Sequence, residues 1–242
     1  MIELPVNRKT LLELYKTAQK HTLTFEENEL YARGKNPHIA AMTHKRDPDN
    51  RLALPFAKMA VSDMCGYAGR SGDRFVTVDN IATEQSAQED ATTDDFIEKF
   101  NETQVLNETD IETAELYNQA LIQGKAYELV WTVNELEGAG MLAEYAMIPG
   151  NQVVMIRDDS LKDVVRAAAW FHDDTDPDGM PVVHCDVFYP FYSEGWKLRG
   201  GQWVRDEERD MAYPFEDVPL IEYSINRTGD SFFEAEKGIL FS

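Results

Sequence analysis

The first third of the chain alternates apolar and polar residues at helical spacing. Residues 7–20 place Leu11, Leu14, Tyr15 and Ala18 on one stripe, with Asn7 as a capping residue. A second helix is predicted from Thr24 to about Ala32, because Gly34 and the Asn36-Pro37 turn end it. This part of the chain therefore predicts helices that each bury one face.

The helix after Pro55 shows the most apolar pattern of this region. Proline at a first helical turn loses no backbone hydrogen bond, so Pro55 marks a helix start. The apolar residues that recur on one face are Phe56, Met59, Ala60, Met64 and Tyr67, with Lys58, Ser62 and Asp63 opposite them. We expect this stripe to lie in a core, and Phe56→Ala or Met59→Ala to cost about 2–5 kcal/mol.

Further signals divide the middle of the chain. Residues 74–78 predict a short strand, and the polar stretch 79–91 predicts a loop. A helix is expected from Thr92 to Phe100, with carboxylates at its positive end. Asn107 predicts the cap of another helix, which Gly124 ends.

Beyond Ala126 the pattern changes to short runs rich in β-formers, separated by Gly, Pro and Asp turns. Eight strands are predicted, at residues 127–133, 140–147, 152–156, 164–171, 181–188, 195–198, 202–205 and 218–225. Helices first and antiparallel strands second indicate an α+β fold rather than alternating βαβ units. We therefore expect a helical part at 1–125 and a β-rich part at 126–242.

Charge is distributed unevenly along the chain. The sequence has 44 acidic and 23 basic residues, a net charge of −21. Residues 1–50 hold eight basic and seven acidic groups, whereas residues 79–122 hold twelve acidic groups and Lys99 alone as a base. Such a surface repels phosphate backbones, so ordinary nucleic-acid binding is not expected. A solvated, solubilising face is the simpler interpretation of the acidic run.

The sequence also indicates the cellular compartment in which the protein is made. No run approaches the ~20 apolar residues that a membrane span requires, and the first residues lack the apolar centre of a signal peptide. Cys65 and Cys185 are far apart in the sequence, so no disulfide framework is expected. We place the protein in a reducing cytoplasm while it is made.

Candidate chemistry is sparse. Asp174, Asp176 and Asp178 copy the opening of an EF-hand loop, but Cys185 occupies the twelfth position, where that loop needs a bidentate Glu. A polar hairpin turn is the favoured interpretation, and calcium binding tighter than about millimolar is not expected. His184 and Cys185 are strand neighbours that point to opposite faces, so they cannot jointly hold zinc.

No catalytic or nucleotide-binding motif is present. The chain contains no GxGxxG, GxxxxGK[ST] or GxSxG pattern. We therefore expect no enzyme, no catalytic, cofactor-binding or metal-binding residues, and no cofactor. A metal-dependent nuclease built on residues 173–178 remains an alternative, and divalent-dependent cleavage would be its test.

Four segments, taken in order, resemble the portal proteins of tailed double-stranded DNA bacteriophages of the siphophage type. The first, residues 29–37, has a Tyr-x-x-Gly-x-x-Pro element at 31–37, and the second has Asn50-Arg-Leu followed by Phe-Ala-Lys58 and Gly66-Tyr67. The third, residues 120–129, contains Gly124-Lys-Ala-Tyr-Glu128. The fourth begins at Tyr213 and contains Val218-Pro-Leu-Ile-Glu222, with Asn226, Gly229-Asp230 and Glu234 behind it. Pro55 departs from the pattern without opposing a helix start.

The resemblance implies a structural, non-enzymatic protein of the virion. It would form a homo-oligomeric ring, a dodecamer in the full-length protein, at the capsid vertex through which DNA is packaged and ejected. Implied partners are the terminase large subunit, the major capsid and scaffolding proteins, the head-tail adaptor, and double-stranded DNA that passes without specific binding; no membrane is implied. The expected locations are the virion and, during assembly, the host cytoplasm.

The portal family continues past the point that corresponds to Ser242, so the resemblance covers the wing and stops where the stem begins. This implies a piece that alone is chiefly monomeric at micromolar concentration. The alternative is an acidic binding module that mimics DNA and inhibits a nucleic-acid-binding protein. A tight one-to-one complex with a DNA-binding protein would favour that alternative.

Overall fold

The computed structural model describes residues 4–35, 56–68, 100–134, 141–160, 162–175 and 179–234. Its helices are α1 (Arg8–Ala32), α3 (Phe56–Ala68) and α5 (Thr109–Gln123), with a helical segment at 100–106 before α5. No described helix has the length and apolar character that a membrane crossing demands. The predicted strand at 74–78, the loop at 79–91 and most of the predicted helix at 92–100 lie outside the described residues.

The strands form two antiparallel sheets. The three-stranded sheet has the order β2-β1-β9, formed by β1 (Lys125–Asn134), β2 (Met141–Ile148) and β9 (Leu220–Ser224). The six-stranded sheet has the order β3-β4-β5-β6-β7, with β8 paired to β6. Its strands are β3 (Val153–Arg157), β4 (Val165–Thr175), β5 (Pro181–Tyr189), β6 (Tyr192–Arg199), β7 (Gln202–Arg205) and β8 (Met211–Ala212). Single 3-10 turns, η1 (Gly150–Gln152) and η2 (Glu207–Arg209), complete the order. The α+β prediction is confirmed.

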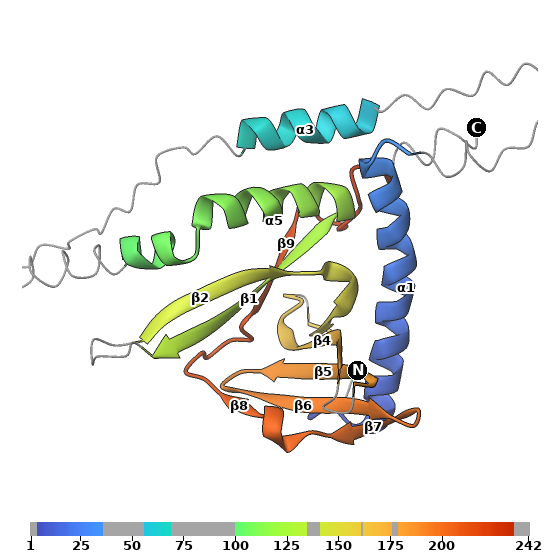
Figure 1. The fold of residues 1–242 in the computed structure, drawn as a ribbon, viewed down its shortest axis with the longest axis vertical. Coiled ribbons are helices and arrows are strands. Elements are labelled where there is room, and N and C mark those ends of the chain that lie inside the picture. Colours follow the sequence, from blue (N-terminus) through green and yellow to red (C-terminus); the bar gives the residue numbers. More distant parts are fainter. Residues whose placement is uncertain are drawn as a thin grey trace, which may run out of the picture.

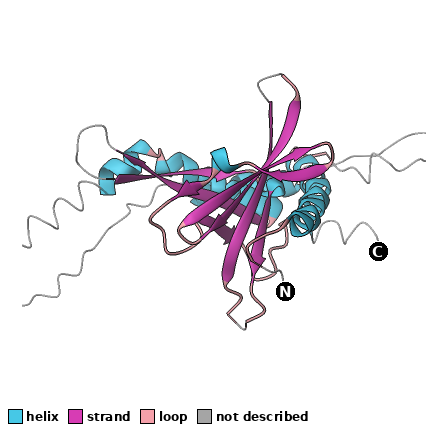
Figure 2. Ribbon diagram, turned by 90° about the horizontal axis from the view of Figure 1, so that it is seen from below, coloured by secondary structure: helices cyan, strands magenta, loops and turns pink. Residues whose placement is uncertain are grey.

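The elements stack in layers (Figure 1). α3 lies over α5, α5 covers the three-stranded sheet, and that sheet packs on part of the six-stranded sheet through Tyr127, Ile148, Val153, Phe188 and Leu220. α1 runs along one side and contacts both α5 and the six-stranded sheet. Figure 2, turned by 90° so that the molecule is seen from below, shows the strands extending to both sides of the helices.

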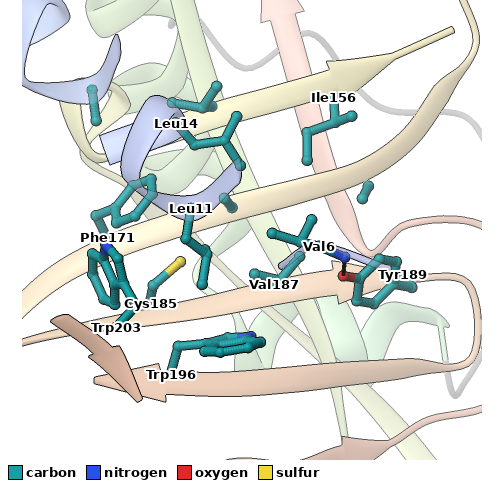
Figure 3. Close-up of a cluster of buried hydrophobic side chains, with 14 residues drawn as sticks. Val6, Leu11, Leu14, Ile156, Phe171, Cys185, Val187, Tyr189, Trp196 and Trp203 are labelled. Atoms are coloured by element: carbon teal, nitrogen blue, oxygen red, sulfur yellow. Dashed lines mark hydrogen bonds between the residues drawn. The ribbon is translucent and has the colours of Figure 1, made fainter. Parts of the chain in front are cut away.

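The main core lies between the first half of α1 and the six-stranded sheet (Figure 3). Leu11, Leu14 and Ala18 of α1, the stripe predicted from the sequence, are buried there. They meet the alternate residues of β4, β5 and β6 that face this side, among them Phe171, Cys185, Val187 and Trp196. The Val6 amide anchors the chain before α1 by donating to the Tyr189 hydroxyl at 2.9 Å.

α1 is one continuous helix of 25 residues, so the prediction of two separate helices is wrong. The residues between the two predicted helices contain neither Gly nor Pro, and the Thr22 hydroxyl donates back to the Ala18 carbonyl within the helix. Asn7 caps the helix as predicted, because its side-chain oxygen accepts from the amides of Lys9 and Thr10 at 3.0 Å.

Asn107 does not cap α5, which corrects a second prediction. The residue before the helix is Glu108, whose side chain makes no capping bond. Asn107 instead binds the free edge of β2: its Nδ2 donates to the Ala143 carbonyl at 3.0 Å, and its Oδ1 accepts from the Tyr145 amide at 2.8 Å. Glu112 accepts from the Met147 amide in the same way. Side chains around the start of α5 thus occupy an edge that another strand could otherwise extend.

Candidate functional site

Parts of the chain that are far apart in the sequence converge where α1, α3 and α5 pack together. The buried residues of this motif junction are Tyr31, Val61, Leu121, Ile122 and Phe233. Tyr31 stacks on Phe233 with ring centroids 5.9 Å apart. Tyr31 belongs to the first of the four ordered segments, and Val61 lies within the second. Leu121 and Ile122 lie in the third, and Phe233 lies in the fourth.

Gly124 connects α5 to β1 in this junction. It has φ +85°, a left-handed conformation that glycine adopts without strain. A Cβ on this residue would overlap the Gly229 carbonyl oxygen. The segment around Gly229 closes the end of α5, because the Ser231 hydroxyl donates to the Ile122 carbonyl at 2.6 Å and the Phe232 amide to the Leu121 carbonyl at 3.0 Å. The third and fourth segments are therefore in direct backbone contact.

The carboxylate of Glu222 in β9 connects the third and fourth segments through ion pairs and a hydrogen bond. It accepts from Lys125 Nζ at 3.2 Å, from Arg157 Nη2 at 3.0 Å and from the Tyr127 hydroxyl at 3.1 Å. The side chain is 11% exposed, and two cations balance its charge. Arg157 ends β3, so this carboxylate ties the three-stranded sheet to the six-stranded sheet.

A polar contact links α1 to the end of α5. The Asn28 amide donates to Gln123 Oε1 at 3.1 Å, and Gln123 Nε2 donates to Glu29 Oε1 at 3.3 Å. A cavity of about 530 Å³ opens beside these residues, and Phe25, Leu30 and Met147 are among the side chains that line it. Two residues of the first segment therefore contact this region: Glu29 binds Gln123 of α5, and Tyr31 stacks on Phe233.

α3 is buried through a different face from the predicted one. Met59 is 58% exposed and Tyr67 is 84% exposed, whereas Val61 is 5% exposed and packs in the motif junction. Cys65 lies on the same side as Val61 and contacts Asn118 of α5. The predicted core stripe is therefore wrong for Met59, Met64 and Tyr67, and the Phe56 side chain lies outside the described residues. Apolar periodicity locates a helix but does not select among its apolar faces.

The two faces of α3 give a direct test. We expect Val61→Ala to lower the free energy of unfolding by about 1.5 kcal/mol, since it removes two buried methyl-sized groups. Met59→Ala, on the same helix, should change it by less than about 0.5 kcal/mol. Urea denaturation of both variants measures the difference, and a larger loss for Met59→Ala would contradict the burial described here.

A network of ionisable side chains lies on the face of the six-stranded sheet opposite α1. Asp186 accepts from Arg209 Nε at 3.0 Å and Nη2 at 2.6 Å, and its Oδ2 lies 3.0 Å from His172 Nε2. His184 stacks on His172 with ring centroids 5.7 Å apart, and Lys197 binds Asp206 at 2.9 Å beside them. Gly195 permits this packing, because a Cβ there would overlap the Arg209 Cβ.

The electrostatics of this network follow from burial and pairing. Burial raises the pKa of Asp186, but hydrogen bonds from His172 and Arg209 outweigh it and lower that pKa below its ordinary value. Burial, with the nearby Arg209 and His172, lowers the pKa of His184. Asp174 and Asp206 oppose that shift without reversing it.

Stability should therefore depend on pH in two ranges. Below the ordinary histidine pKa of 6.5, the unfolded chain protonates His184 before the folded chain does, so stability falls as the pH drops. Below about pH 4 the contribution of Asp186 is lost as well. His184→Gln should weaken the dependence of the thermal midpoint on pH as the pH falls below 6.5, while leaving the loss below about pH 4 intact. His21, whose pKa burial also lowers, should keep part of that slope in the variant. A slope below pH 6.5 equal to that of the natural chain would contradict this role of His184.

The candidate metal turn is only partly described. Asp173 and Asp174 are exposed at the end of β4, and residues 176–178 lie outside the described ranges. Asp174 Oδ1 accepts the amide of Thr175 at 2.7 Å. Among described residues, no group of three or more His, Cys, Asp or Glu side chains has the geometry of a metal site. His184 and Cys185 point to opposite faces as predicted: Cys185 lies in the core with α1, and His184 faces His172.

A comparison with known protein families identifies the class of protein. The family model described as phage portal protein, SPP1 Gp6-like, matches residues 9–240. Because this range is almost the whole 242-residue sequence, the chain belongs to that family. Its members are structural components of the phage capsid that assemble as homo-oligomeric rings. The search of curated proteins returned no match. The resemblance carried by the four segments is confirmed.

Proposed function

We propose that copies of this chain form the ring at one capsid vertex through which double-stranded DNA enters and leaves the phage head. Family membership over residues 9–240 carries this proposal. The proposed partners are the terminase large subunit during packaging, the major capsid and scaffolding proteins around the ring, and the head-tail adaptor afterwards. Assembly would take place in the host cytoplasm, and the finished ring would belong to the virion.

The charge of the chain suits passage of DNA without binding. The 44 acidic residues of the subunit outnumber its 23 basic residues and repel phosphates on balance, so a channel built from it would hold no duplex in place. We expect no gel shift with a duplex of any sequence at physiological salt. Micromolar or tighter binding would contradict passive passage, and a known duplex-binding protein provides the positive control.

Assembly is tested by imaging. The chain is expected to be chiefly monomeric at micromolar concentration, and negative-stain micrographs at higher concentrations should show closed rings of uniform diameter, since one repeated heterologous interface closes around an axis. Open filaments or isolated pairs would contradict a closed ring. A stable one-to-one complex with a DNA-binding protein, with no ring at any concentration, would replace this proposal by the DNA-mimic alternative.

A further inference from the structure

α1 presents a basic face to solvent in a chain whose net charge is strongly negative. Residues 8–20 contain four basic side chains and one acidic side chain, Glu13. We define the α1 outer face by its exposed cations and leucines, which are Arg8, Lys9, Leu12, Lys16, Lys20 and Leu23; the exposed carboxylates Glu13 and Glu26 lie at its border. None of its four cations forms an ion pair with any part of the chain that the structure describes. Leu12 and Leu23, 41% and 70% exposed, lie along the same face.

A second exposed face, at the start of α5, has the opposite charge. Residues 100–124 contain five acidic side chains and no basic one. The exposed residues of this α5 acidic face are Glu102, Val105, Leu106, Glu108, Ile111 and Glu115. Val105 is 78% exposed and Ile111 is 56% exposed, so the carboxylates surround an apolar centre.

The α5 acidic face also offers a place for a cationic side chain. A hollow of about 340 Å³ beside Ile111 has the three carboxylates Glu108, Glu112 and Glu144 in its lining. Glu112 and Glu144 each accept one hydrogen bond, from the Met147 amide and the Trp131 indole, and carboxylate oxygens have further lone pairs for a cation. Lys125 is the only basic residue in the described ranges 100–134 and 141–148, and its ammonium group is bound to Glu222.

The two faces lie on opposite sides of the molecule. In Figure 1 α1 forms one side, and the helical segment 100–106 with the start of α5 forms the other. Figure 2 keeps the same separation after the 90° turn. A single chain therefore cannot pair its own two faces, whereas two neighbouring copies can.

We propose that the α1 outer face of one subunit docks on the α5 acidic face of the next subunit. This proposal deepens the ring proposed above and rests on it. A ring needs two different, complementary surfaces on opposite sides of each subunit, because the interface is heterologous. Opposite charges would also offset the repulsion between subunits that each carry −21, and the exposed leucines would pack on Val105, Leu106 and Ile111.

Charge reversal and its repair test this contact. The first variant carries Lys16→Glu with Lys20→Glu, the second carries Glu108→Lys with Glu115→Lys, and the third carries all four changes. We expect the first two to weaken self-association at least about tenfold at low ionic strength, and the third to restore it. An equimolar mixture of the first two should also associate, because each then supplies the face that the other needs.

Matched controls separate this contact from net charge. Lys162→Glu with Arg227→Glu, and Glu207→Lys with Glu208→Lys, change the net charge equally at exposed residues outside both faces. These controls should associate like the natural chain. Sedimentation velocity over a wide concentration range measures association, and circular dichroism verifies that each variant is folded. At about 1 M salt, where the Debye length is about 3 Å, the differences between variants should shrink.

The outcomes are distinct. If the natural chain forms rings and the first two variants form them equally well, this contact is wrong and the portal ring stands. If the third variant, with all four substitutions, stays dissociated, the contact is also wrong. The same holds if the two controls lose association as much as the first two variants. If the natural chain neither associates nor forms rings at any concentration, the ring proposal itself fails.

Discussion

Gly124→Ala should lower the free energy of unfolding by about 4 kcal/mol, one of the two largest single-residue effects expected in this protein. The left-handed backbone conformation alone costs roughly 1–2 kcal/mol for a residue with a side chain. The new methyl group would also overlap backbone atoms of both Gly229 and Asp230. Backbone cannot rotate away as a side chain can, so the bonds that close α5 would have to open.

The control for this prediction is Gly201→Ala. Gly201 has a similar positive φ, +78°, but a Cβ there meets no atom within 4 Å. We expect a loss of about 1 kcal/mol, the conformational cost without the overlap. Guanidinium denaturation of both variants measures the difference. Equal losses would show that the contact between residues 124 and 229 is not needed for stability.

Phe233→Ala should cost about 3–5 kcal/mol, because this fully buried ring stacks on Tyr31 at the centre of the motif junction. The cavity left behind would be lined by side chains of α1, α3 and α5, which are held from other directions and cannot all collapse. The loss should appear in thermal melts and in denaturant titrations alike.

Phe232→Ala is the matched variant. Phe232 is the neighbouring aromatic residue and is 37% exposed, so its removal should cost about 1 kcal/mol or less. A comparable loss for the two variants would mean that Phe233 does not carry the junction. Because Phe233 and Gly229 hold the same segment, variants at Gly124 and Phe233 should be less than additive when combined.

Gly124 and Phe233 also lie where segments that are far apart in the sequence meet. Tyr31, Gly124 and Phe233 are separated by about a hundred residues in the chain, yet each contacts the end of α5 or a residue beside it. In a subunit that must repeat one interface around a ring, a rigid junction between helices keeps the two outer faces at a constant relative position.

Interactions between residues that are near neighbours in the sequence were sufficient to predict much of the fold. The Asn7 cap, the Gly124 stop and all eight predicted strands of the second half are present, because capping, left-handed glycine and period-two alternation depend on near neighbours. The four ordered segments likewise depend only on the residues and their order, and by themselves they indicate the portal family.

Other features of the structure depended on which elements pack together in the tertiary structure. α3 has more than one apolar face, and only its packing on α5 and α1 selects Val61 over Met59. Asn107 has the local signal of a cap, but the unpaired edge of β2 competes for it and prevails. His172, Asp186 and Arg209 become neighbours through strand register and a turn over Gly195, which leave no local signal in the sequence. Near neighbours along the chain determine helices and strands, whereas burial and register arise from contacts between distant residues, and the tertiary structure alone decides those.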